Sequence, residues 1–337
     1  MTPRRLPILL IAVTIVSGCS SNGAEPATST RDTTTPTETT TTTAVPTTTT
    51  TTTIVPSPSG GEPLPTLDDG RPSTWVGVTA DYEAVEVDTA SGDVIRSLGQ
   101  VSTAEDVETA ECAACVNAID AVWRTYDGSH ILISECCEPA AGLIHVLTED
   151  EIPLLPAGDR EPWFFWFATP APDSLRVAFL GYQLLLTSID DPTRDVIEVL
   201  DRFPISNAVW TAGGETVQWL EDDGGSVHLR TFEVLTATST SVPLGALDGW
   251  NLAGLARRAT GELVVARPQP DGVATSVLVF TPGGELVEEI PIEAGARLGG
   301  YDRSGTFLIY TADDGAVRWM GDGDGGVLAD GYVHASW

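Results

Sequence analysis

Short apolar runs separated by polar turns recur along the chain from about residue 73 onward, a pattern typical of β-strands. The clearest stretch covers residues 118–156, which hold four such runs. Turn-forming residues separate these runs, which lie at residues 118–123, 130–136, 143–148 and 151–155. The stretch therefore predicts a four-stranded antiparallel meander of about 40 residues, the repeating unit of a β-propeller.

The same unit recurs on both sides of this stretch, with a first unit of three runs and four later units of four runs each. The first unit has its runs at residues 73–78, 83–88 and 94–98. The later units have theirs at residues 162–167, 175–180, 184–189 and 196–200; 207–210, 216–220, 227–235 and 240–244; 251–255, 263–267, 276–281 and 286–292; and 297–301, 307–311, 316–320 and 327–329. The pattern predicts an all-β fold, a six-bladed propeller with four-stranded antiparallel blades.

The last run, residues 332–337, stands alone and matches the inner strand that the first unit lacks. It ends in Ala-Ser-Trp337, which resembles the Ala-Val-Trp endings at Trp123 and Trp210. These tryptophans are separated by two and then three repeats of about 43 residues. We therefore expect this run to complete the first blade and close the ring, which removes an exposed sheet edge. A seventh blade within residues 101–116 and a pair of β-sandwiches are the alternatives.

Residues 88–99, DTASGDVIRSLG, resemble the outer half of a blade in TolB-like and WD-repeat propellers. The Trp-Asp ending of a true WD repeat is missing. The Trp-Ser-Pro-Asp-Gly turn of TolB-like repeats is present in reduced form at residues 123–128 and 210–214. The resemblance is one of pattern and implies a β-propeller from about residue 73 onward.

Residues 1–18 predict an export signal rather than a part of the fold. Arg4 and Arg5 supply the positive end, and residues 6–16 form an apolar run too short to span a bilayer. The small residues before Cys19 resemble the lipobox of bacterial lipoproteins. This resemblance implies a lipid on Cys19 and a chain anchored to the outer face of the cytoplasmic membrane, for which we expect a Gram-positive-type envelope. An ordinary secretory cleavage site is the alternative, and general secretion fits the flanking residues better than twin-arginine export.

Residues 19–71 have a different composition, dominated by Thr and Pro with almost nothing apolar to bury. Such a segment cannot offset its ordering entropy, so we predict a disordered stalk. As a flexible coil it would span roughly 40 Å. A stalk glycosylated on its threonines and an unmodified tether both stay open. Residues 72–337 are then expected to form the propeller domain.

The chain is strongly acidic, with 48 Asp and Glu against 17 Lys and Arg and a formal net charge of −31. DNA, RNA and anionic lipid would each need a basic patch, so this balance argues against all three as partners. We expect a monomer that is attached to the membrane through Cys19 and binds an envelope protein or a glycan.

Four cysteines besides Cys19 lie at Cys112, Cys115, Cys136 and Cys137, and an even number in an exported chain indicates disulfides. In a blade, the loop that enters the inner strand lies beside the end of the second strand. We therefore predict two bridges that join the first pair to the second, with the connectivity open. A vicinal bridge, a four-cysteine zinc site and a redox role are the alternatives.

The remaining candidates for chemistry favour structural roles. Of the four histidines, His130, His145 and His228 lie in or beside predicted strands, while His334 falls on the closing inner strand, where it could line the central channel. No two histidines have metal-ligand spacing, and nucleophile, phosphate-loop and zinc-protease motifs are missing from the sequence. Residues 322–325 resemble half a calcium loop but lack its later glutamate, which favours a hairpin turn. We predict no cofactor and no metal.

The densest aromatic stretch, residues 163–167, is expected to pack between blades, with a platform for a sugar or aromatic ligand as the alternative.

Propellers commonly bind ligands at the axial funnel, on the face whose loops enter the inner strands. The candidate rim residues on that face are Asn117, Asp120, Arg160, Glu161, Asn207, Asn251, Arg297, Asp330 and His334. A cell-surface, non-catalytic binding module is the leading hypothesis. An extracellular lactonase or glycan-cleaving hydrolase with carboxylates in the funnel is the second, and a purely structural spacer the third.

Overall fold

The structure is a computed structural model in which all described residues lie in one compact unit, within Thr52–Trp337. It describes residues 64–100, 118–138, 141–147, 165–181, 183–188, 198–200, 202, 204–248, 254–266, 276–292 and 296–337. The predicted signal segment, Cys19, most of the predicted stalk and the stretch proposed for a seventh blade lie outside the described residues.

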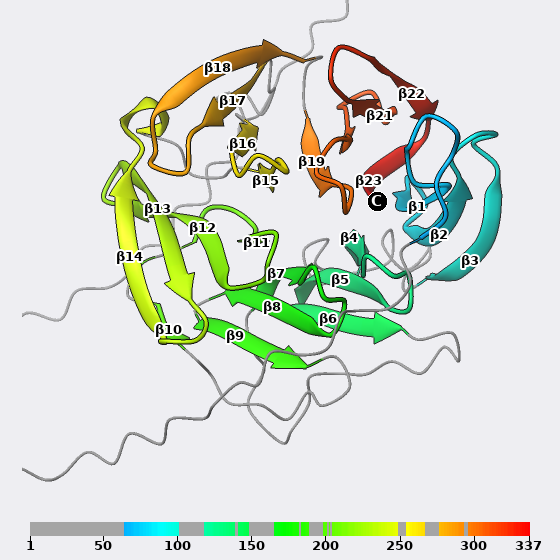
Figure 1. Ribbon diagram of the computed structural model, residues 1–337. Helices are drawn as coiled ribbons and strands as arrows, with labels where there is room; N and C mark the ends of the chain where they lie inside the picture. The colour runs from blue at the N-terminus through cyan, green and yellow to red at the C-terminus, as the bar shows by residue number, and fades with distance from the viewer. Residues whose placement is uncertain are drawn as a thin grey trace, which may run out of the picture. The chain divides into compact units, whose positions relative to one another are not determined.

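The described residues form strands β1 to β23 and one short 3-10 helix, η2 (Gly245–Leu247), and they contain no α-helix. The strands build five antiparallel sheets of four strands and one of three, which we number along the chain (Figure 1). Sheet 1 contains β23 (Tyr332–Ser336), β1 (Thr74–Thr79), β2 (Glu83–Asp88) and β3 (Val94–Gln100). Sheet 2 contains β4 (Ala118–Arg124), β5 (Ile131–Glu138) and β6 (Ala141–Leu147). Sheet 3 contains β7 (Phe165–Pro170), β8 (Arg176–Gly181), β9 (Gln183–Ser188) and β10 (Glu198–Val199).

The last three sheets follow the same order, with the inner strand first and the outer strand last. Sheet 4 contains β11 (Val209–Trp210), β12 (Thr216–Asp223), β13 (Ser226–Glu233) and β14 (Thr238–Pro243). Sheet 5 contains β15 (Gly254–Arg257), β16 (Leu263–Ala266), β17 (Ser276–Phe280) and β18 (Leu286–Pro291). Sheet 6 contains β19 (Arg297–Tyr301), β20 (Leu308–Thr311), β21 (Val317–Met320) and β22 (Gly325–Ala329).

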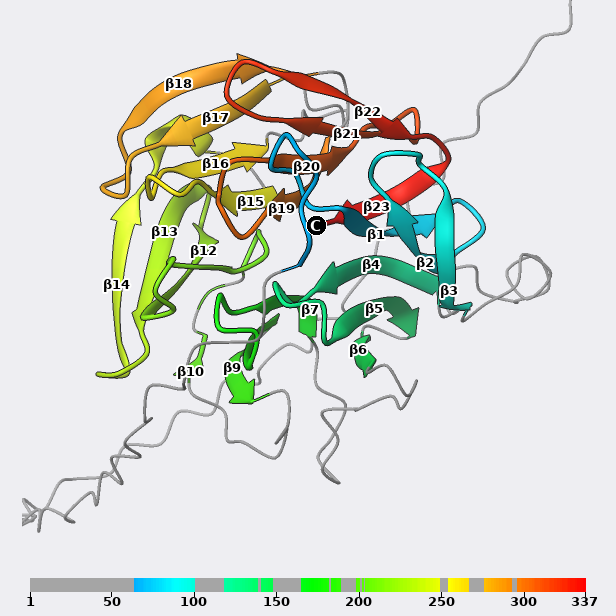
Figure 2. The same ribbon diagram turned by 45° about the vertical axis from the view of Figure 1, so that its right-hand side comes forward.

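The sheets are arranged around a common centre because their two faces are both apolar. Successive side chains of a strand point to opposite faces, so in β1 Trp75 packs into a cluster shared with sheet 6, while Val76 and Val78 pack against sheet 2. Comparable clusters lie between every pair of consecutive sheets. Each fully buried large apolar side chain contributes about 1.5–3 kcal/mol. The inner strands β4, β7, β11, β15, β19 and β23 contact one another in this order around the centre (Figures 1 and 2).

The C-terminal strand closes this ring, as the sequence predicts. Strand β23 pairs with β1 in antiparallel register, with Val76 opposite Ser336 and Val78 opposite His334. The number of complete blades differs from the prediction, because five sheets have four strands and sheet 2 has three within the described ranges. The run predicted as its fourth strand, residues 151–155, lies outside them.

Residues 64–72, just before β1, already contact the propeller. Thr66 pairs with Pro72 in an isolated bridge, and the backbone N–H of Ser73 donates to the carbonyl of Pro65 at 2.8 Å. The guanidinium of Arg71 lies 4.4 Å from the ring centroid of Trp319 in sheet 6. The described fold therefore starts several residues before the predicted boundary at residue 72.

Among the residues that the structure describes, no helix is long and apolar enough to cross a membrane.

Candidate functional site

A pocket of about 280 Å³ lies where the inner strands of the ring end. Its walls come from the last residues of these strands and from the hairpin turns that follow them. Each of the six sheets contributes, with Trp123, Thr169, Trp210, Arg257, Tyr301 and Trp337 as one lining residue apiece. The pocket is therefore a product of the ring rather than of any single blade.

The hairpin turns around the pocket share one backbone pattern. Gly128 donates its N–H to the carbonyl of Thr125 at 2.9 Å, and Gly214 and Gly305 donate in the same way three residues back along their own turns. Gly128 has φ +73° and Gly305 has φ +70°, a region that glycine enters without steric cost. The reduced turn motif predicted at residues 123–128 and 210–214 is thus confirmed as the turn that follows an inner strand.

Several polar side chains near the centre bind the exposed inner edges of neighbouring strands. The side chain of Asn207 donates to the carbonyl of Leu255 and accepts from its N–H, both at 2.8 Å. Thr169 donates its hydroxyl to the carbonyl of Ala208 at 2.8 Å. Because unpaired backbone groups are costly in a partly dry channel, these contacts stabilise the inner rim. Asn207, a predicted ligand residue, lines the pocket. Its side-chain amide is already bound to the backbone and joins sheets 4 and 5.

His334 has a similar structural role between sheets 1 and 2. It is buried, and its Nδ1 accepts a hydrogen bond from the backbone N–H of Val122 at 3.3 Å. Its ring also contacts Trp123 edge to face, with 5.7 Å between ring centroids. Burial, together with the charge of Arg297, lowers the pKa of His334 to about 3. The imidazole is therefore neutral at physiological pH and acts as an acceptor.

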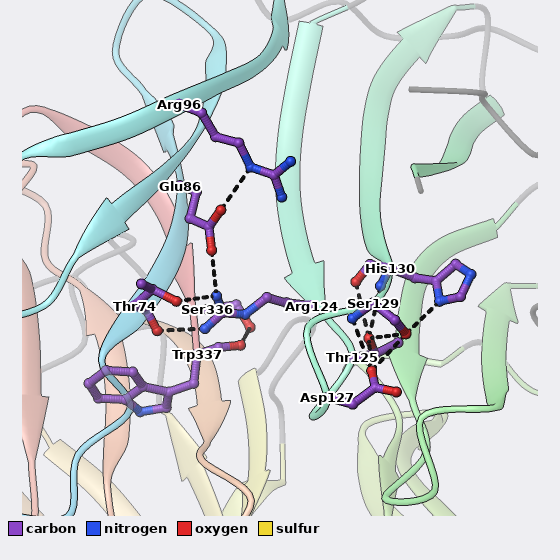
Figure 3. A network of polar contacts seen from close by, with 10 residues as sticks. All are labelled: Thr74, Glu86, Arg96, Arg124, Thr125, Asp127, Ser129, His130, Ser336 and Trp337. Atoms are coloured by element: carbon purple, nitrogen blue, oxygen red, sulfur yellow. Dashed lines mark hydrogen bonds and ion pairs between the residues drawn. The ribbon is translucent and has the colours of Figure 1, made fainter. Parts of the chain in front are cut away.

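The most buried charge at the site belongs to Arg124, at the end of β4 (Figure 3). Its Nη1 donates to Glu86 at 3.1 Å and to the hydroxyl of Thr74 at 2.6 Å, and its Nη2 donates to the carbonyl of Thr74. Glu86 also pairs with the exposed Arg96 at 2.8 Å. Burial lowers the pKa of Arg124 to about 10, and Glu86 opposes this shift. Arg124 therefore stays cationic at neutral pH and joins sheet 2 to sheet 1.

The turns of sheets 2 and 6 approach each other at the pocket. Burial, together with the carboxylate of Asp302, raises the pKa of Tyr126 to about 12. The carboxylate of Asp302 accepts hydrogen bonds from the backbone N–H groups of Ser304, Thr306 and Phe307 at 2.8–3.0 Å. Asp302 thus shapes its own turn, and it is the one carboxylate side chain among the described lining residues.

Two adjacent arginines of the lining differ in their partners. Arg257 donates from Nη1 to the amide oxygen of Gln218, and burial lowers its pKa. Arg258 donates to the hydroxyl of Tyr301 and pairs with Glu262 and Glu288 at 3.3 and 3.4 Å. Burial lowers the pKa of Arg258, but these partners together raise it above its ordinary value.

The pocket opens at the opposite end of the inner strands from the predicted funnel. Of the predicted rim residues, Asn207 lines this pocket. Arg297 and Asp330 are exposed at or before the start of an inner strand, and Asp120 lies on β4. Asn117, Arg160, Glu161 and Asn251 lie outside the described residues. Ligand binding at that other rim stays a prediction.

The arginines and aromatic residues of the pocket are not among the predicted site residues, because they lie at the ends of the inner strands and the prediction concerned the loops before these strands. They carry a signal in the sequence all the same. Arg124 directly follows Trp123, Arg257 and Arg258 end an inner-strand run, and Arg303 lies in the turn after β19. A basic residue at or just after the end of an inner strand thus marks the pocket in sheets 2, 5 and 6.

The cysteine prediction stays untested, because Cys112 and Cys115 lie outside the described residues and Cys136 and Cys137 are described only as part of β5. His130 and His228 each contact a serine hydroxyl, Ser129 at 2.8 Å and Ser241 at 3.2 Å. His145 is described only as part of β6. Within the described ranges, His, Cys, Asp and Glu side chains form no group of three able to hold a metal ion.

One sequence interpretation of local structure is confirmed, and a second is supported at the one residue whose side chain is described. Residues 321–324 form the turn between β21 and β22, in which the N–H of Gly321 donates to the carbonyl of Asp324 at 2.8 Å. From the aromatic stretch 163–167, Phe167 packs against the apolar cluster between sheets 3 and 4. The other side chains of that stretch lie outside the described part of the chain.

No protein-family model matches this sequence, and no curated protein matches it. Its fold resembles solved structures. A chain of the nidogen/laminin complex is 9% identical, with a TM-score of 0.55, and the match covers 78% of this chain and 97% of that chain. TolB from Acinetobacter baumannii is 13% identical, with a TM-score of 0.54, and the match covers 78% of this chain and 65% of TolB. At this identity the likeness shows the fold alone, a β-propeller.

Proposed function

We propose that this chain is a lipid-anchored, extracytoplasmic β-propeller of six blades that binds a protein or glycan partner as a monomer without catalysing a reaction. The observation that carries the proposal is the axial pocket, to which all six sheets contribute residues and five contribute aromatic or cationic side chains. Tryptophan, tyrosine and arginine are the residues that binding surfaces favour. The proposal counts sheet 2 as the sixth blade, because the sequence predicts a fourth strand for it at residues 151–155. The nidogen/laminin structure is itself a complex, which supports interaction as a use of this fold.

The alternative function, a hydrolase, has less support from the same pocket. Such an enzyme needs ionisable side chains that converge on the reacting atoms. Among the described lining residues, Asp302 alone has a carboxylate side chain, and its oxygens accept hydrogen bonds from the backbone of its own turn. The binding function needs no such group.

A photocrosslinking amino acid at Ser304 is expected to capture a partner in living cells of the bacterium that makes the protein. Ser304 is exposed at the pocket, in the turn after β19. Asp330 is the matched control, because it is also exposed but precedes β23, whereas the pocket lies at the end of that strand. Adducts are read as shifted bands and identified by mass spectrometry. Adducts at neither position, or equally at both, would contradict a partner at the pocket face.

Lipidation of Cys19 is expected to hold the full chain on the membrane. Cells fed an alkyne fatty acid should incorporate the label into the protein, and Cys19→Ser should abolish the label and move the protein into the medium. Cys112→Ser is the control for a cysteine that the proposal does not lipidate. Membrane retention of the unlabelled Cys19→Ser variant would refute the anchor.

A further inference from the structure

Arg257 is unusual among the arginines of this chain. Of the eleven described arginines, eight form an ion pair with a carboxylate, namely Arg71, Arg96, Arg124, Arg176, Arg202, Arg230, Arg258 and Arg318. Arg297 and Arg303 have interactions of their own. Arg257 donates to the neutral amide of Gln218, and it forms no ion pair with a described carboxylate. In a protein with 48 acidic residues and 17 basic ones, a cation without a carboxylate requires an explanation.

The surroundings of Arg257 hold it in place without neutralising it. Gln218 is buried on β12, and its Nε2 donates to the hydroxyl of Thr231 at 3.0 Å, which turns its amide oxygen toward Arg257. Burial lowers the pKa of Arg257, with no carboxylate acting against the shift. The guanidinium is therefore partly dehydrated, fixed at one nitrogen and still charged at neutral pH.

We propose that Arg257 binds a carboxylate group of the ligand in the axial pocket, an inference that rests on the binding function proposed above. A guanidinium presents its donors as a planar fork that matches a carboxylate, and its fixed position reduces the entropy lost on binding. The walls beside it include Trp210, Leu255, Leu298 and Trp337. These walls fit an apolar or aromatic body next to the charged group.

The charge balance favours a carboxylate over a phosphate. One uncompensated guanidinium matches one negative charge, while a phosphate carries close to two at neutral pH. The excess charge would lie in the same pocket as Asp302 and inside a chain with a formal net charge of −31. A volume of about 280 Å³ suits a small organic acid or one terminal residue of a peptide.

The test titrates the full chain, purified in detergent, with two carboxylates while tryptophan fluorescence is recorded. N-acetylphenylalanine represents a peptide terminus and 3-phenylpropionate a free organic acid, and the amide of each is the neutral control. We expect saturable binding of at least one acid, at least tenfold weaker binding of its amide, and at least tenfold weaker binding by Arg257→Gln. The acid that binds more tightly identifies the source of the carboxylate.

Arg318→Gln is the matched control, since Arg318 lies outside the pocket lining and its charge already has a carboxylate partner, Asp314. It should bind the acids within about threefold of the unchanged protein. Thermal unfolding should show Arg257→Gln folded and at least as stable as the unchanged protein, because a partly buried, uncompensated cation is removed. Equal binding by Arg257→Gln, binding of neither acid, or tighter binding of inorganic phosphate would each overturn the proposal.

The outcomes separate this inference from the binding function. One outcome is that crosslinks at Ser304 persist in Arg257→Gln while neither acid binds. This outcome would support the proposed binding function and reject a carboxylate ligand at Arg257. Acid binding through Arg257 without any crosslink would support the carboxylate site and reject a macromolecular partner.

Discussion

Replacing Glu86 by alanine is expected to lower the free energy of unfolding by about 3–5 kcal/mol, because it leaves the guanidinium of Arg124 buried without a counter-ion. The side chain of Arg124 is 1% exposed, and that of Glu86 is 16% exposed. The hydroxyl and carbonyl of Thr74 would still accept hydrogen bonds from Arg124, but neither carries a charge. Urea unfolding followed by tryptophan fluorescence measures the loss.

Arg96→Ala is the control for this pair. Arg96 binds the other carboxylate oxygen of Glu86, but its side chain is 43% exposed, so its removal should cost at most about 1 kcal/mol. Glu86→Gln keeps the shape and a hydrogen-bond acceptor and should lie between the two. A loss below about 1 kcal/mol for Glu86→Ala would show that solvent or Thr74 suffices to hold Arg124, and that the ion pair does not stabilise the joint between sheets 1 and 2.

The strands of this propeller were readable from the sequence because their signals are local. Apolar runs bounded by Asp-Gly and similar turns place most strand limits within one to three residues, as in β2 and β19, which match their predicted runs at both ends. Strand β11 was harder, with two paired residues where four were predicted. Ring closure was also readable, because the ending at Trp337 repeats the endings at Trp123 and Trp210.

The pocket was not readable in the same way, because its contacts join residues far apart in the sequence. The side chain of Asn207 binds the backbone of Leu255 in the next sheet, and Arg257 binds Gln218 in the sheet before it. A single sequence carries no pattern that predicts either contact. Asn207 was predicted as a ligand residue on its loop position, yet its amide is engaged with backbone. Nothing in the sequence distinguishes Arg257 from the other arginines. Its lack of a carboxylate is visible only after the other arginines have been paired.

Replacing Gly299 by alanine is expected to cost about 3 kcal/mol or more, because the added methyl group has no space. Gly299 lies on β19 beside the register shift at Leu298 and Gly300. A Cβ there would overlap the carbonyl oxygen of Ala335 on β23 and lie 2.9 Å from a methyl group of Ile309. The first obstacle is backbone, which no side-chain rotation can relieve, so sheets 6 and 1 would have to separate where the ring closes. For a domain of this size, 3 kcal/mol corresponds to a fall in melting temperature of roughly 6–12 °C.

Gly283→Ala is the matched control for this substitution, since it adds the same methyl group in a turn where the nearest atom is the hydroxyl oxygen of Thr281, at 3.7 Å. That is ordinary van der Waals contact, so the melting temperature should stay within about 2 °C. Because Gly299 also lines the pocket, a folded Gly299→Ala protein should bind the carboxylate probes more weakly. If the melting temperature of Gly299→Ala equals that of Gly283→Ala, sheets 6 and 1 are not in tight backbone contact.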